Sequence, residues 1–150
     1  MAIGAPHDDS AGIYTGSAYV IYGGNLGNQG VNLDDIVLGT GGFKITGVGA
    51  SSHLGASIAG VGDVNGDGIN GFLLGAIGEE ESGAAYVVFG TQASVSGINL
   101  GEVAQGSGGF KIIGENTNDF VGGSLSSAGD VNGDGIADLL IGASRNDSTG

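Results

Sequence analysis

Residues 129–143 read GDVNGDGIADLLIGA, and residues 62–76 carry a near-copy, GDVNGDGINGFLLGA. The two stretches belong to a longer repeat, because residues 17–83 align without a gap to residues 84–150 with 28 identities. Residues 2–12 also match residues 140–150 and are followed by four extra residues, 13–16. A fixed period of 67 residues predicts two copies of one structural unit, 17–83 and 84–150, with the end of a preceding repeat at 1–16.

Each unit contains short apolar runs, rich in β-branched and aromatic residues and bounded by glycine and asparagine, which predict strands. We place them at about 2–5, 17–22, 42–47, 56–61, 71–76, 84–89, 109–114, 123–128 and 138–143. The segments VNLDDIV and INLGEVA predict one short turn of helix each. Four strands per unit is typical of a propeller blade, whereas a solenoid usually repeats at half this period or less. The sequence therefore predicts an all-β fold of about two four-stranded antiparallel β-propeller blades, starting and ending mid-blade.

The loop of the second copy places oxygen donors where a calcium loop needs them. Asp130, Asn132 and Asp134 occupy positions 1, 3 and 5. Ile136, at position 7, offers its main-chain carbonyl while its side chain turns into the core, and Asp138 adds a carboxylate at position 9. Calcium takes six to eight oxygen ligands, and the two intervening glycines give the positive φ that lets the backbone curl around an ion. We expect this loop to bind calcium.

The loop of the first copy is one carboxylate short. Asp63, Asn65 and Asp67 are present, and Ile69 stands at the carbonyl position. Position 9, however, is Gly71. We expect weaker calcium binding at this loop, or an ion whose shell is completed by water.

Three other calcium motifs are excluded. The EF-hand and dockerin loops need an acidic ligand at position 12, where this chain has Leu74 and Ile141. The calcium β-roll needs a nine-residue glycine-aspartate period that is absent. A single motif of this kind can also be an asparagine-glycine turn that binds nothing. Duplication at a fixed period, together with Asp138, favours the calcium interpretation.

The composition limits the partners. Three basic and sixteen acidic residues give a net charge of −13, which repels nucleic acid and anionic lipid and attracts cations. The chain has no cysteine, so neither a disulfide nor a thiolate metal site is expected. No apolar run approaches the roughly 20 residues of a membrane span, and the N-terminus lacks a signal-peptide pattern. We expect no membrane insertion, and either an intracellular protein or an internal piece of a longer one.

No residue pattern predicts catalysis. The chain has two histidines: His7 in a loop, and His53, which aligns with Phe120 and is interpreted as a packing residue at a strand start. A nucleophile elbow, a phosphate loop and a zinc-spaced histidine pair are all missing. The sequence therefore predicts a non-enzymatic protein with calcium as its one cofactor.

Three further features receive structural interpretations. The stretch GEEESG at 78–83 is interpreted as a solvated loop, although it aligns with acidic residues of the sister loops. Lys44 and Lys111, one unit apart, are expected to cover apolar surface with their stems and keep their ammonium groups in water. Aromatic residues that alternate on strands are assigned to the core between blades: Tyr19, Tyr22, Tyr86 and Phe89.

A resemblance to a known family rests on the order of the strands, on the D-x-N-x-D-G-x-x-D loop, and on the segments LLIGA and YVVFG. In these features the chain resembles the FG-GAP repeat of the integrin α-subunit head and its bacterial relatives of 67-residue type. The Phe-Gly of the family name corresponds to Leu54-Gly55 and Val121-Gly122, and Gly-Ala-Pro is intact once, at residues 4–6. The resemblance implies a propeller, usually of seven blades, with calcium in a hairpin loop of some blades. It also implies a secreted or cell-surface protein engaged in adhesion or ligand binding.

Three functional hypotheses follow. The first is a non-catalytic, calcium-stabilised propeller segment that presents loops to a protein or carbohydrate ligand. The second is an accessory propeller of a larger secreted hydrolase, such as a phospholipase, since this repeat also occurs beside catalytic domains. The third, an intracellular scaffold, fits poorly with the weak calcium affinity of extracellular modules. Because two blades cannot close a ring, we expect either a piece of a longer chain or a subunit of a homo-oligomer.

Overall fold

A computed structural model describes residues 1–24, 30–92, 95 and 97–146 of the 150-residue chain. Strands dominate this part of the chain: β1 (Ala2–Ala5), β2 (Ser17–Ile21), β3 (Gly42–Thr46), β4 (Leu54–Gly62), β5 (Gly71–Ala76), β6 (Ala84–Val88), β7 (Gly109–Ile113), β8 (Val121–Gly129) and β9 (Asp138–Ala143). The short helices α1 (Leu33–Val37) and α2 (Leu100–Val103) and a 3₁₀ turn (Glu79–Glu81) complete it. Every predicted strand and both predicted helical turns are confirmed, with end shifts of two residues or fewer.

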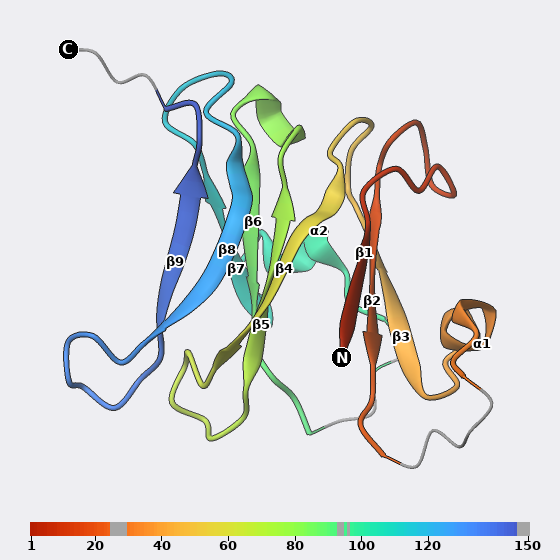
Figure 1. Cartoon of the computed structure of the whole chain (residues 1–150), viewed down its shortest axis with the longest axis horizontal. Coiled ribbons are helices and arrows are strands. Elements are labelled where there is room, and N and C mark those ends of the chain that lie inside the picture. The colour runs from red at the N-terminus through yellow and green to blue at the C-terminus, as the bar shows by residue number, and fades with distance from the viewer. Residues whose placement is uncertain (25–29, 93–94, 96, 147–150) are drawn as a thin grey trace.

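The strands form three antiparallel sheets in the order β1-β2-β3, β4-β5-β6-β7 and β8-β9. Figure 1 shows them standing side by side, with the four-stranded sheet in the middle. This middle sheet takes two strands from residues 17–83 and two from residues 84–150, so it straddles the sequence repeat. One complete four-stranded meander thus lies between a three-stranded and a two-stranded sheet, as expected for one propeller blade between two partial ones, and the predicted all-β class is confirmed.

Apolar side chains fill the space between neighbouring sheets. One cluster joins the first sheet to the middle sheet and includes Ile45, Leu54, Leu74 and Tyr86, all completely buried. A second cluster, around the fully buried Leu73, joins the middle sheet to β8-β9. Burying one such side chain contributes about 1.5–3 kcal/mol, so the contacts between sheets, rather than any single sheet, stabilise the fold.

Two glycine pairs bring the sheets together. A Cβ on Gly4 of β1 would lie 2.0 Å from the carbonyl oxygen of Gly55 on β4, and a Cβ on Gly75 of β5 would lie 2.1 Å from that of Gly122 on β8. Gly55 and Gly122 have φ of +87° and +84° and sit where the register of their strands shifts. Only glycine fits both the conformation and the close approach. Gly4 and Gly75 are the glycines of the Gly-Ala elements, and Gly55 and Gly122 follow Leu54 and Val121 at the places that correspond to Phe-Gly.

Both helices begin with a capping asparagine. The Asn32 side chain accepts a hydrogen bond from the Asp34 backbone N–H, and Asn99 accepts one from Gly101. Helix α1 packs Ile36 against Tyr19 and Ile21 on one face of the first sheet. Helix α2 places Leu100 and Val103 in the cluster between the first two sheets. Asparagine caps satisfy otherwise unpaired N–H groups, which explains why such short helices form here.

One face of the last sheet is open to solvent. Leu140 of β9 is 58% exposed, whereas Leu73, at the same place in the preceding repeat, is 0% exposed. The difference arises because the middle sheet has a neighbour on each side. Among the described residues, no helix is long and apolar enough to cross a membrane.

Candidate metal centre

The first candidate loop folds around the carboxylate of Asp63. Its Oδ1 accepts hydrogen bonds from the backbone N–H groups of Asn65, Gly66 and Asp67 at 3.2, 2.7 and 3.2 Å, and its Oδ2 accepts one from Gly68 at 2.7 Å. The Asn65 amide donates to Asp67 Oδ2 at 2.9 Å. Position 1 therefore organises the backbone of the whole turn, and positions 3 and 5 lie together at its surface.

The second loop repeats this arrangement. Asp130 Oδ1 accepts from Gly133 and Asp134 at 2.7 and 3.1 Å, and Oδ2 accepts from Gly135 at 2.8 Å. The Asn132 amide donates to Asp134 Oδ2 at 3.0 Å. Both loops use left-handed glycines at the same two places, with φ of +78° and +83° in the first and +80° and +87° in the second. The predicted role of these glycines in curling the backbone is confirmed.

Both position-1 carboxylates are held in their charged form. The pKa of Asp63 is lowered, chiefly by the Gly68 N–H, and that of Asp130 is lowered chiefly by the Gly135 N–H. Hydrogen bonds to the charged form favour it. Each loop therefore presents negative oxygen at neutral pH, as a hard cation requires.

The position-9 residues differ as the sequence indicated. Asp138 turns its carboxylate back to the start of its own loop, where Oδ2 accepts from the Val131 N–H at 2.7 Å. In the first loop, a Cβ on Gly71 would lie 2.6 Å from the Val88 carbonyl oxygen. Any larger side chain at Gly71 would require the backbone to shift, which gives a packing reason for the missing carboxylate.

The two loops touch at one end of neighbouring blades (Figure 1). The Ala137 N–H donates to the Asp63 carbonyl oxygen at 2.8 Å, so the second loop is bonded directly to the first. Ile136 was expected to point into the core, and this was wrong. Its side chain is 38% exposed, and its Cδ1 lies 3.9 Å from the place of a Cβ on Gly66, at the surface of the first loop. Ile69, its counterpart, is half-buried.

The loop side chains bond within their own turns rather than converging on a common centre. In the part of the chain that the structure describes, no three acidic or histidine side chains gather in a metal cluster. The oxygen donors at positions 1, 3 and 5 nevertheless lie on one short turn of fixed backbone, and their chemistry suits calcium.

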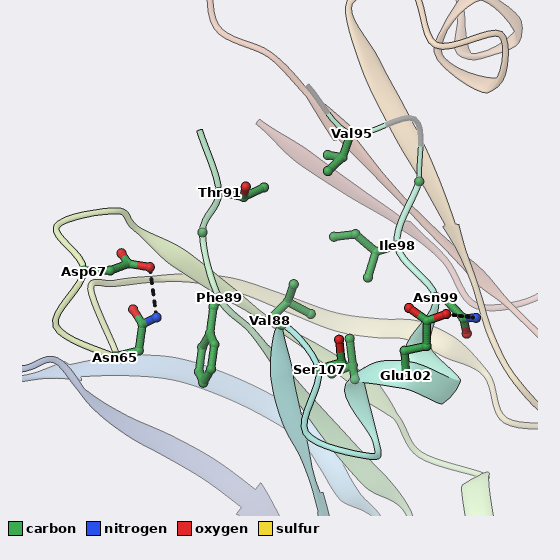
Figure 2. A pocket seen from close by; sticks show the side chains of 14 residues that line it. Asn65, Asp67, Val88, Phe89, Thr91, Val95, Ile98, Asn99, Glu102 and Ser107 are labelled. Carbon is green, nitrogen blue, oxygen red and sulfur yellow. Dashed lines mark hydrogen bonds between the residues drawn. The ribbon is translucent and has the colours of Figure 1, made fainter. Parts of the chain in front are cut away.

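A cavity of about 420 Å³ opens beside the first loop (Figure 2). Asn65 and Asp67 lie on one side of it, and Asn99 and Glu102 of the α2 region lie on the other. Apolar side chains such as Val88 and Ile98 form part of the wall between them. The combination of an apolar wall with polar groups at the rim is the usual character of a ligand site.

A polar cluster at the opposite end of the blades was not predicted. Lys111 of β7 contacts Glu79 at 2.8 Å and also bonds Glu80, while the Tyr86 hydroxyl donates to Glu79 at 2.5 Å. Glu79 is 8% exposed. The expectation of a solvated GEEESG loop is therefore wrong for Glu79, because that carboxylate is buried between a cation and a hydroxyl.

The preceding repeat contains the same cluster. Lys44 contacts Asp8 at 2.7 Å, and the Tyr19 hydroxyl lies 3.5 Å from the same carboxylate. Each lysine also lies over the ring of its cross-strand tyrosine, at 5.6 Å for Lys44 over Tyr19 and 5.8 Å for Lys111 over Tyr86. The expectation that both ammonium groups stay in water is wrong.

The electrostatics of these clusters follow from burial and pairing. Burial is the largest single influence and would raise the pKa of Asp8 and lower that of Lys44. The bond between the two side chains, together with the hydrogen bonds of Ser10 to Asp8 and the contact of Tyr19 with Lys44, outweighs it, so the pKa of Asp8 is lowered and that of Lys44 raised. The pKa of Lys111 is raised in the same way, by its glutamate partners. The pKa of Tyr86 is raised well above its ordinary value, first by burial and then by its bond to Glu79.

The aromatic assignments were right in part. Tyr86 and Tyr19 are buried, at 0% and 8% exposure, and Phe89 is half-buried against the second core cluster. Tyr22 is 41% exposed and contacts Phe43 at the sheet edge, so its assignment to the core was wrong. The recurrence of the tyrosine and lysine one unit apart was the sequence signal for the polar clusters.

The fold defines a class of protein: blades of a β-propeller joined at glycine pairs, with an aspartate-organised turn between β4 and β5 and another between β8 and β9. Comparison with known proteins identifies the family within this class. The family model described as FG-GAP repeat matches residues 121–150. Integrin alpha-2 of Mus musculus is 34% identical over 94 residues, covering 62% of this chain and 8% of that protein. The chain belongs to the FG-GAP repeat family.

Two further relatives extend the similarity. Integrin alpha-M of Mus musculus is 37% identical over 95 residues, covering 61% of this chain and 8% of that protein. Phosphatidylinositol-glycan-specific phospholipase D of Bos taurus is 34% identical over 149 residues, covering 95% of this chain and 16% of that protein. The chain thus spans only 8 to 16% of the length of these relatives.

Proposed function

We propose that this chain is a non-catalytic, calcium-binding segment of an FG-GAP β-propeller in a secreted or cell-surface protein, where it serves adhesion or ligand recognition. The observation that carries the proposal is the pair of matched turns around Asp63 and Asp130. Family membership supports the propeller, and the integrin relatives support the adhesive role and the location. The sequence units 17–83 and 84–150, preceded by 1–16, are the repeats of this propeller.

In the proposed second site, Asp130, Asn132, Asp134 and Asp138 supply side-chain oxygens and Ile136 its carbonyl. Bound calcium would supply positive charge that relieves the repulsion among these carboxylates. The amide of Asn132 now meets the Asp134 carboxylate, and this contact is the one that a cation would replace. Asp138, bonded to the start of the loop, is within the same turn.

In the proposed first site, Asp63, Asn65, Asp67 and the carbonyl of Ile69 are the ligands. Gly71 supplies no side chain, so water completes the shell and the affinity is lower. Because Ala137 of the second loop donates to the Asp63 carbonyl, an ion in either loop stabilises the contact between blades. The role of the metal is structural: it fixes the loop-bearing ends of the blades.

Thermal unfolding in calcium, magnesium or chelator tests the metal proposal. Extracellular calcium modules bind at about 0.1–1 mM. With an affinity of about 0.1 mM, 10 mM calcium stabilises the folded chain by about 2.7 kcal/mol. For a chain of this size, that raises the midpoint by about 5–10 °C. Magnesium prefers a tighter octahedral shell and should raise the midpoint less.

Variants separate the two loops. Asp134→Ala should remove more of the calcium-dependent shift than Asp67→Ala, because the first loop already lacks a ligand. Glu115→Ala removes an exposed carboxylate outside both loops and is the matched control. A calcium shift that is absent in the wild type, or unchanged in Asp134→Ala, contradicts the metal proposal. Equal losses from the two loop variants contradict the role given to Gly71.

A second candidate function is an accessory propeller segment of a larger secreted hydrolase. The observation that favours it is the match to the phospholipase D relative over 95% of this chain. The protein sequence that adjoins this chain in its gene distinguishes the two candidate functions. A catalytic domain there supports this candidate, whereas further FG-GAP repeats with an adhesive domain support the first.

A further inference from the structure

The two histidines of the chain lie next to each other. His7, in the loop after β1, and His53, just before β4, are 46 positions apart in the sequence, yet their ring centres are 5.5 Å apart and their planes meet at 86°. Tyr14 stacks on His53 at 5.5 Å and meets the edge of His7 at 5.7 Å. These loops lie at the end of the blades opposite the aspartate turns (Figure 1).

The backbone holds His53 in one place. Its N–H donates to the Tyr14 carbonyl at 3.0 Å, and the neighbouring Ser51 N–H donates to Ile13 at 2.8 Å. His53 Nδ1 lies 3.2 Å from the Pro6 carbonyl oxygen. A carbonyl only accepts, so Nδ1 carries the hydrogen and the lone pair is on Nε2. A backbone acceptor on one ring nitrogen is the usual way in which proteins orient a metal-binding histidine.

The second repeat shows that this backbone does not require histidine. Phe120 occupies the place of His53 with nearly the same φ, 57° against 53°. Arg145 aligns with His7 in the sequence but belongs to the same blade as Phe120, where its guanidinium lies 4.5 Å from the ring centre. The residue that stands to Phe120 as His7 stands to His53 is Gly78, which lines one cavity with Phe120. The two imidazoles therefore meet at the junction between the first two blades, where the next junction has glycine and phenylalanine.

The spacing of the rings suits a shared ion. A Zn–N bond of about 2.0–2.1 Å puts the ring centre about 3.2 Å from the metal, so two tetrahedral imidazole ligands have centres about 5.2 Å apart. We propose that His7 and His53 form a two-histidine site for a divalent transition-metal ion of the zinc, nickel and copper class. The net charge of −13 draws such cations to the surface.

The surroundings leave room for the remaining ligands. His7 is exposed, and His53 also lines a cavity of about 360 Å³ with Ser51, Glu81 and Asn118. Water from this side completes the coordination shell. The site differs in kind from the aspartate turns, because imidazole nitrogen selects transition metals and carboxylate oxygen selects calcium.

Zinc titration of the calcium-saturated chain, purified without a polyhistidine tag, tests the proposal. Calorimetry gives the affinity, and the imidazole signals in nuclear magnetic resonance spectra identify the ligands. We expect one zinc ion per chain, shifts at both histidines, and tighter binding of copper than of nickel. His53→Phe and His7→Arg, which install the residues of the second repeat, should each weaken zinc binding at least ten-fold.

Asp134→Ala, which alters a calcium turn, should leave zinc binding unchanged. The proposal is overturned if zinc at 1 mM shifts neither histidine, or if both histidine variants bind zinc as the wild type does. Circular dichroism confirms that each variant is folded before it is titrated. Because phenylalanine already occupies the backbone position of His53 in the second repeat and His7 is exposed, both variants should pass this check.

Discussion

The hydroxyl of Tyr86 offers a direct measure of what the buried polar cluster contributes to stability. We expect Tyr86→Phe to destabilise the chain, because the substitution removes the 2.5 Å hydrogen bond to Glu79 and keeps the ring. Glu79 then retains only Lys111 at Oε1, and its Oε2 already has no hydrogen-bond partner among the described residues.

The magnitude follows from the charge and burial of the acceptor. A hydrogen bond to a charged group contributes about 1.5–3 kcal/mol, and Tyr86 is 0% exposed, so solvent cannot replace the lost donor. Tyr19→Phe is the matched control in the preceding repeat. Its hydroxyl lies 3.5 Å from Asp8, which also accepts from Lys44 and from the Ser10 N–H at 2.8 Å. We expect this control to lose about 0.5 kcal/mol or less.

Equilibrium unfolding in urea at pH 7 and fixed calcium concentration measures both variants. The free energy of unfolding should fall by about 2 kcal/mol more for Tyr86→Phe than for Tyr19→Phe, with unchanged dependence on urea. Equal losses, or a loss below about 0.5 kcal/mol for Tyr86→Phe, would refute the assignment of a stabilising role to the buried hydroxyl.

Two further predictions concern packing and charge. Leu73→Ala should lower the free energy of unfolding by about 3–5 kcal/mol, since Leu73 is 0% exposed. Leu140→Ala, at the same place in the next repeat, should lower it by less than about 1 kcal/mol, since Leu140 is 58% exposed. Similar losses for the two variants in urea unfolding would contradict the difference in burial. Because the pKa of Asp8 is lowered in the folded chain, its ion pair with Lys44 stabilises above pH 3.8 and this stabilisation is lost as the pH falls below it. Because the pKa of Lys44 is raised, the stabilisation is also lost as the pH rises above 10.5. Asp8→Asn should flatten both limbs of the stability profile, and an unaltered acid limb would contradict the linkage.

The sequence predicted the elements of this fold well because the repeat made each pattern visible twice. Strand positions depend on local patterns of apolar residues, and the turns depend on the spacing of aspartate and glycine. Both can therefore be deduced from residues that are close in the sequence. The close approach of Gly4 to Gly55 and of Gly75 to Gly122 explains why glycine recurs at these strand positions.

The side-chain environments were harder to predict, since they depend on segments far apart in the chain. Lys111 meets Glu79 across 32 positions, and His7 meets His53 across 46. Nothing local distinguishes a paired lysine from one that extends into water. Ile136 was misplaced for the same reason, because the surface it lies against belongs to the loop of the other repeat.

The glycine pairs between sheets have a consequence for how such proteins evolve. Each duplicated unit carries both halves of a junction, one glycine on its first strand and one on its second, and Gly142 on β9 stands where Gly4 and Gly75 stand. Because main chain meets main chain at this junction, the angle between neighbours does not depend on which side chains the loops display. Whole units can therefore be gained or lost by recombination, and their loops can diverge toward new ligands, without any change at the joints.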